Sequence, residues 1–133
     1  MKKSHALFLL AAPLLIACPK VPVTNRMSFN IVPESEEMTL GLQSYQQILK
    51  TAKLSTNTAA VAMVRRVGER IAKVSDRPDF AWEYNLIENP KTPNAFCLPG
   101  GKVAVYSGIL PITQSEAGLA VVLGHEIAHA IAK

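Results

Sequence analysis

The sequence has 133 residues, of which 49% are hydrophobic and 18% are charged, with a formal net charge of +4. Disordered chains have few apolar residues, so this composition excludes a wholly disordered protein and predicts one folded domain. Two of the 14 basic residues, Lys2 and Lys3, lie at the start of the chain, and the other 12 nearly balance 10 acidic residues. The charge therefore gives no support for nucleic acid as a partner.

The first residues have the features of a secretory signal. Lys2 and Lys3 precede a mostly apolar run over residues 6–16, which is shorter than the roughly 20 residues of a membrane-spanning helix. The text LLIAC that ends at Cys18 resembles a bacterial lipobox, in which the cysteine is lipidated after cleavage. We therefore expect a lipoprotein signal peptide over residues 1–17 and a membrane anchor at Cys18. The alternative is that Cys18 is only a small apolar residue of the leader.

The predicted anchor has consequences for location and for the second cysteine. A lipoprotein of this kind lies in the bacterial cell envelope, and Pro19 after the cysteine favours the periplasmic face of the outer membrane. With Cys18 acylated no internal disulfide can form, so Cys97 is expected either as a small buried residue or as a thiol that awaits a partner. Residues 18–33 contain three prolines and no sustained period, which predicts an extended tether.

Two amphipathic helices are predicted after the tether. Residues 34–54 place apolar side chains at steps of three and four, and residues 56–75 repeat that pattern. The second helix also carries a group of basic side chains off its apolar stripe. We expect these on a solvated face, with contact to anionic lipid as the alternative. They are Arg65, Arg66, Arg70 and Lys73.

A strand and a hairpin are predicted next. Residues 82–87 alternate between apolar and polar side chains, which is typical of a strand. Residues 94–99 and 102–108 flank Gly100 and Gly101, and paired glycines suit the positive φ angles of a tight two-residue turn. We therefore expect a small antiparallel sheet that contains a hairpin.

The last helix is predicted to begin at residues 113–116, because TQSE matches the capping box that satisfies the first amide groups of a helix. Between residues 117 and 132 the ionisable side chains are His125, Glu126 and His129, and all other residues are Ala, Gly, Val, Leu or Ile. A helix that is apolar on all sides is usually buried, so we expect a buried helix.

His125, Glu126 and His129 form the pattern H-E-x-x-H. Side chains four residues apart on a helix differ by about 40° in direction, so both imidazoles can bind one metal ion, with Glu126 beside them. Zinc activates its bound water, and a neighbouring carboxylate can take the proton. With 3 His among 133 residues the pattern is expected by chance about 0.004 times, which makes chance a poor explanation.

The predicted metal site has only two ligands, whereas a catalytic zinc ion usually has three from the protein. Glu116 is the nearest acidic residue on the same helix, but it lies about 180° from His125 and so faces the opposite side. The other acidic residues have no ligand pattern.

The segments NAFCLPGGKVAVYSGIL and SEAGLAVVLGHEIAHAIAK, with the helix SEEMTLGLQSYQQIL, resemble peptidase family M48, the family of the CaaX prenyl protease and the envelope proteases HtpX, LoiP and BepA. The resemblance covers residues 35–133. It implies an α+β, zincin-like (gluzincin) fold in which two helices and a small antiparallel sheet precede the active-site helix. Residues 34–133 would then be the N-terminal part of a zinc metallopeptidase domain.

The resemblance also implies roles for individual residues. His125 and His129 would bind one zinc ion, Glu126 would be the general base, and a Glu beyond Lys133 would be the third ligand. Asn94, Ala95 and Phe96 would border the substrate cleft, where a substrate adds a strand to the sheet edge.

Two functions are compatible with these features. The first is a lipid-anchored zinc metalloendopeptidase that acts on unfolded or misassembled envelope proteins, with weak or no activity in the chain as printed because it contains two ligands. The alternative is a non-catalytic envelope lipoprotein that binds or chaperones client proteins. The natural substrate and the oligomeric state stay open.

Overall fold

The computed structural model describes residues 32–132. Its elements are α1 (Glu34–Thr51), α2 (Thr58–Val74), β1 (Glu83–Ile87), β2 (Ala95–Leu98), β3 (Lys102–Tyr106), the 3-10 helix η1 (Ser107–Ile109), α3 (Leu110–Thr113) and α4 (Glu116–Ile131). The predicted signal peptide, Cys18 and nearly all of the tether lie outside the described residues, so the lipid anchor stays a prediction. Within residues 32–132, no helix is both long and apolar enough to cross a membrane.

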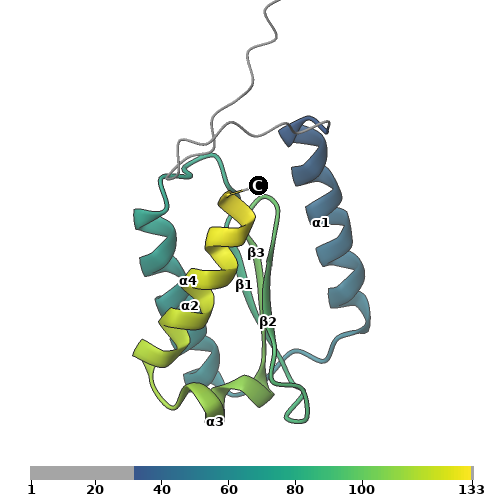
Figure 1. Cartoon of the computed structure of the whole chain (residues 1–133). Coiled ribbons are helices and arrows are strands. Elements are labelled where there is room, and N and C mark those ends of the chain that lie inside the picture. The colour runs from purple at the N-terminus through teal and green to yellow at the C-terminus, as the bar shows by residue number, and fades with distance from the viewer. Residues whose placement is uncertain (1–31, 133) are drawn as a thin grey trace, which may run out of the picture.

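The elements form three layers, with the sheet in the middle (Figure 1). α1 covers one face of the sheet, and α2 and α4 cover the other. Alternate side chains of the strands therefore belong to two separate apolar clusters, one beneath α1 and one beneath α2 and α4. The predicted α+β class is confirmed at this level of detail.

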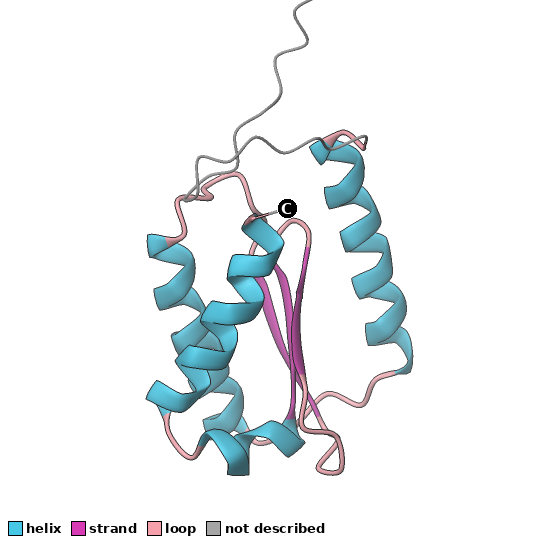
Figure 2. Cartoon of the chain, viewed as in Figure 1, coloured by secondary structure: helices cyan, strands magenta, loops and turns pink. Residues whose placement is uncertain are grey.

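The sheet is mixed, with the strand order β1-β3-β2. Figure 2 shows the strands between the helices. β2 and β3 pair antiparallel around Gly100 and Gly101, whose φ angles are +82° and +80°, so the predicted hairpin is confirmed. β1 runs parallel to β3, and the prediction of a purely antiparallel sheet is wrong. The reason is that β1 and β3 are not consecutive, because β2 lies between them in the sequence. The connection that brings β3 beside β1 is therefore a crossover and not a tight turn, which allows the two strands to run parallel.

Tyr45 attaches α1 to the sheet. Its side chain is fully buried, and its hydroxyl donates a hydrogen bond to the carbonyl oxygen of Val103 at 2.6 Å. The same hydroxyl accepts a hydrogen bond from Nδ2 of Asn85 at 3.1 Å. Burial raises the pKa of Tyr45 to about 12. Gly41, one turn earlier, allows close approach, because a Cβ there would lie 2.4 Å from the carbonyl oxygen of Pro99.

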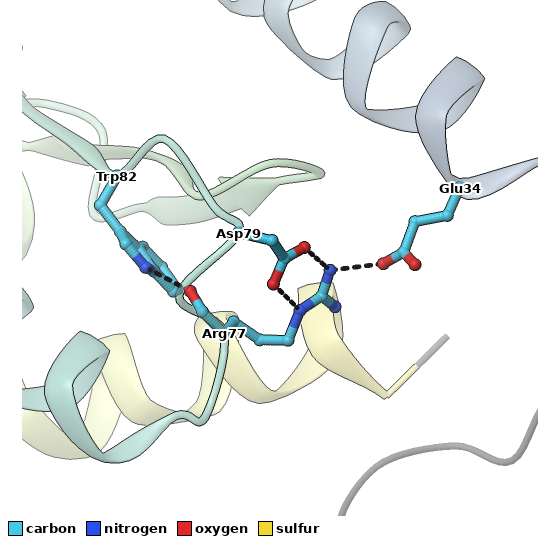
Figure 3. A network of polar contacts seen from close by, with 4 residues as sticks. All are labelled: Glu34, Arg77, Asp79 and Trp82. Carbon is cyan, nitrogen blue, oxygen red and sulfur yellow. Dashed lines mark hydrogen bonds and ion pairs between the residues drawn. The ribbon is translucent and has the colours of Figure 1, made fainter.

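Arg77 ties the start of α1 to the loop between α2 and β1 (Figure 3). Its guanidinium binds the carboxylates of Glu34, at 2.5 Å, and Asp79, at 2.6 Å, and lies 3.7 Å from the ring centroid of Phe80. Nε1 of Trp82 donates to the carbonyl oxygen of Arg77 at 3.2 Å. The Arg77 side chain is only 10% exposed, so the loop that leads into β1 is held by packing as well as by charge.

Replacing Tyr45 with Phe should lower the free energy of unfolding by about 1–2 kcal/mol, because the buried carbonyl oxygen of Val103 loses its hydrogen-bond donor. The variant should also lose less stability at high pH. The folded pKa of Tyr45, about 12, exceeds the ordinary tyrosine pKa of 10.0. Its neutral form therefore contributes fully below pH 10, and that contribution is lost as the pH rises toward 12. Urea unfolding at pH 8 and pH 11 measures both effects.

Burial also raises the pKa of Tyr84 to about 12, so part of the alkaline loss should persist in the Tyr45→Phe protein. An identical loss of stability in the wild type and the variant would contradict the role assigned to Tyr45.

Candidate metal site on the last helix

α4 is anchored by one apolar face. Leu119, Leu123 and Ile127 follow one another at steps of four and are almost completely buried in the cluster shared with α2 and the sheet. The opposite face is open, since Val121 is 75% exposed and both His125 and His129 are exposed. The prediction of a helix buried on all sides is therefore wrong, because within residues 32–132 the neighbours of α4 cover only one side.

The start of α4 differs from the predicted capping box. Ser115 is the N-cap residue, and its Oγ accepts a hydrogen bond from the backbone N–H of Gly118 at 3.1 Å. Thr113 lies in α3, where its hydroxyl donates to the carbonyl oxygen of Leu110 at 3.1 Å. Gln114, with a φ angle of +58°, separates the two helices. Residues 113–116 have the residue types of a capping box, but α3 ends at Thr113, so Thr113 cannot cap α4.

Glu116, the predicted acidic member of the box, instead binds Arg66 of α2. The hydrogen bond from Arg66 holds the pKa of Glu116 below its ordinary value. Arg66 was expected on a solvated face, and its link to the start of α4 is a contact that sequence reasoning missed. Two opposite charges 50 residues apart carry no pattern from which a pairing can be read.

Replacing Ser115 with Ala should destabilise the protein by about 1 kcal/mol, because the N–H of Gly118 loses its acceptor. Thr113→Ala is the matched control. It should destabilise the protein less, because the Thr113 hydroxyl does not accept a hydrogen bond from the first turn of α4. Thermal unfolding of both variants compares them. A larger loss for Thr113→Ala than for Ser115→Ala would restore the capping box as first predicted.

The two histidines of α4 converge on one point. Their Nε2 atoms are 3.0 Å apart, and their ring centroids are 4.4 Å apart with the ring planes at 87°. This is the convergence that a spacing of four residues predicts on a helix. At this distance one Nε2 can donate to the other in suitable tautomers, so the pair is in contact on an open surface.

The pair fits two of the positions of a zinc site. Zinc binds imidazole nitrogen at about 2.0–2.1 Å, and two nitrogens 3.0 Å apart can both lie at that distance from a common point. Glu126 follows His125 directly and is half-buried. Among residues 32–132 no group of three His, Cys, Asp or Glu side chains is arranged to hold a metal ion. The structure thus brings together the predicted pair, and its role as a ligand pair stays a prediction.

β2 carries the residues predicted to border a substrate cleft. Asn94, just before the strand, is exposed, whereas Ala95 is buried in the cluster beneath α4. Phe96 lies on the opposite face of the sheet, where its ring centroid is 6.3 Å from that of Tyr106. The assignment of Asn94, Ala95 and Phe96 to a substrate cleft stays a prediction. β2 is an outer strand of the sheet, so its contribution to a cleft would come from its backbone edge.

Comparison with known proteins relates the chain to metallopeptidases. The protein-family model described as "Peptidase family M48" matches residues 58–133. "Mitochondrial metalloendopeptidase OMA1" of Schizosaccharomyces pombe is 42% identical over 116 residues, which cover 85% of this chain and 34% of that protein. The protein of the same name from Saccharomyces cerevisiae is 32% identical over 127 residues, covering 86% of this chain and 37% of its own length. The chain thus spans about a third of these relatives.

A bacterial relative is more distant. "Beta-barrel assembly-enhancing protease" of Escherichia coli is 28% identical over 94 residues, covering 71% of this chain and 19% of that protein. The predicted location in a bacterial cell envelope, at the outer membrane, is therefore wrong, because similarity of higher identity and coverage is to mitochondrial proteins. The location rested on a few leader residues, and a pattern of that length carries little information beside similarity over 116 residues.

Proposed function

Because the chain belongs to peptidase family M48, we propose that it acts as a zinc-dependent metalloendopeptidase with a gluzincin-type site on α4. The observation that carries the proposal is the convergence of His125 and His129, with Nε2 atoms 3.0 Å apart, on an open helix face next to Glu126. In this proposal the histidines bind the metal, Glu126 is the general base, and a third protein ligand, expected to be a Glu, comes from outside residues 32–132.

The residues of α4 would divide the chemistry between them. A zinc ion held by His125 and His129 would supply Lewis-acid chemistry, which polarises a scissile carbonyl group and makes water more acidic. His125 and His129 would hold the ion through Nε2, which requires the proton on Nδ1 of each ring. Glu126 takes a proton from the attacking water and delivers it to the leaving amine. Because all three lie within five consecutive residues of one helix, their relative positions are set by the helix itself.

Protein segments in an extended conformation are the proposed substrates. β2 is the outer strand next to α4, and an extended segment can add to such an edge through backbone hydrogen bonds. Unfolded or misassembled proteins expose segments that are free to pair in this way. The names of the yeast relatives favour a mitochondrial location for this activity. Lipidation of Cys18 stays a separate prediction that rests on the leader alone.

The purified chain should take up zinc through the histidine pair. We expect His125→Ala and His129→Ala each to weaken zinc binding by at least about ten-fold, because removal of either imidazole leaves one of the two nitrogen ligands. Isothermal titration with zinc measures the affinity. Glu116→Gln is the control, since Glu116 is held by Arg66 at the other end of α4. Unchanged zinc binding in the variant that lacks both histidines would contradict the proposed metal site.

In protein that includes the proposed third ligand, Glu126→Gln should lower the rate of casein cleavage by about 10²–10⁴-fold, the usual contribution of a general base, without changing the zinc content. A chelator should abolish cleavage in the wild type and added zinc should restore it. Cleavage that persists with a chelator, or is unaffected by Glu126→Gln, would contradict the mechanism. Metal-free binding of unfolded casein without cleavage would instead favour the non-catalytic client-binding alternative.

A further inference from the structure

A groove follows the outer edge of β1, at the opposite edge of the sheet from β2. It has a volume of about 570 Å³, within the range of ligand sites. A second hollow of about 440 Å³ shares Arg65 and Glu69 with it and extends toward the start of α2. We call the two together the β1 groove. The larger part is lined by Arg65, Glu69, Ala72 and Lys73 of α2 and by residues 82–85.

The backbone of β1 is available along this groove. The N–H of Glu83 donates to the carbonyl oxygen of Gly101, toward β3. Alternate residues of a strand direct their backbone groups to opposite sides, so Tyr84 and Leu86 direct theirs to the outer edge. The carbonyl oxygen of Leu86 does accept a hydrogen bond there, from the N–H of Ser55 at 2.8 Å. Among the described residues the outer pairing stops at that point, which leaves the edge beside Tyr84 open.

A short segment already shows which kind of partner this edge accepts. Leu54 and Ile87 form an antiparallel bridge, and the N–H of Glu88 donates to the carbonyl oxygen of Lys53 at 2.7 Å. The chain then leaves the edge to begin α2, with Asn57 as its N-cap residue. An antiparallel strand laid against residues 82–85 would continue the line of this existing pairing.

Tyr84 adds an unused hydrogen-bonding group to the residues of the groove. Its side chain is 9% exposed and lines the groove. Among the described residues its hydroxyl is the one buried side-chain polar atom that lacks a hydrogen-bond partner. Buried hydroxyl groups are normally paired, so Tyr84 keeps the capacity for one further hydrogen bond.

The charges that line the groove favour an acidic occupant. Arg66 is paired with Glu116, and Glu83 is paired with Lys102 at 3.5 Å. The remaining charged side chains are Arg65 and Lys73, which are cationic, and Glu69, which is anionic. The α2 wall therefore carries excess positive charge.

We propose that the β1 groove binds an extended acidic segment of a partner protein, which adds to the edge of β1 as an antiparallel strand. Its backbone pairs with Tyr84, and its acidic side chains face Arg65 and Lys73. This is a docking site distinct from the proposed catalytic edge, because β2 and β1 lie on opposite sides of β3.

The test uses a fluorescein-labelled, end-capped hexapeptide of alternating Val and Glu, with the full chain in the presence of EDTA so that the histidine pair cannot contribute through metal. Fluorescence anisotropy should show saturable binding. Arg65→Glu should weaken it by about ten-fold or more, because a charge that faces the peptide is reversed. Arg70→Glu is the matched control, since Arg70 is exposed on the same helix but does not line the groove, and it should change binding by less than about two-fold.

The position of the peptide is measured by amide NMR. The signals of Tyr84 and Leu86 should shift, and their hydrogen exchange should slow, when the peptide is added. Equal weakening by Arg65→Glu and Arg70→Glu, or equal binding of a Val and Lys peptide, would overturn the proposal in favour of non-specific attraction. Shifts confined to β2, shifts that depend on protein concentration without peptide, or no binding at 1 mM peptide would also overturn it.

Discussion

The packing of Leu119, Leu123 and Ile127 beneath α4 is the contact on which the candidate metal site depends. Burial of one such side chain stabilises a protein by about 1.5–3 kcal/mol, so these three together determine how α4 is rotated about its axis. The rotation places His125 and His129 on the open side of the helix. The histidines therefore face outward as a consequence of apolar packing on the other side, independently of any ligand.

The same packing explains why the site has a rigid support. α4 lies against both α2 and β2, and its first turn is held at Ser115 by a cap and at Glu116 by Arg66. Exposed ion pairs contribute little to stability, so the Arg66 contact matters mainly for where the helix begins. The Arg77 network has a comparable place at the start of α1, with a more deeply buried guanidinium.

The central position of β3 gives the sheet two outer edges with different surroundings. Val103, Ala104 and Val105 of β3 are completely buried, and the strands on either side each have one outer flank, which in β1 is paired only at its end, with residues 53–55. The flank of β2 lies near α4, where we propose cleavage. The flank of β1 lies near α2 and its excess positive charge, where we propose docking. A partner held at one edge would stay close to the other without competing for it.

The sequence by itself determined the local features of this protein. The helices α1 and α2, the hairpin at Gly100 and Gly101 and the convergence of two histidines all depend on periods and turns within a few residues. The same residues carried the resemblance to peptidase family M48, which the comparisons confirm. Only the tertiary structure decided the parallel pairing of β1 with β3, the open face of α4 and the helix break inside the capping box. Each of these depends on which distant segments become neighbours, and periodicity along one segment carries no information about the surface that another segment will cover.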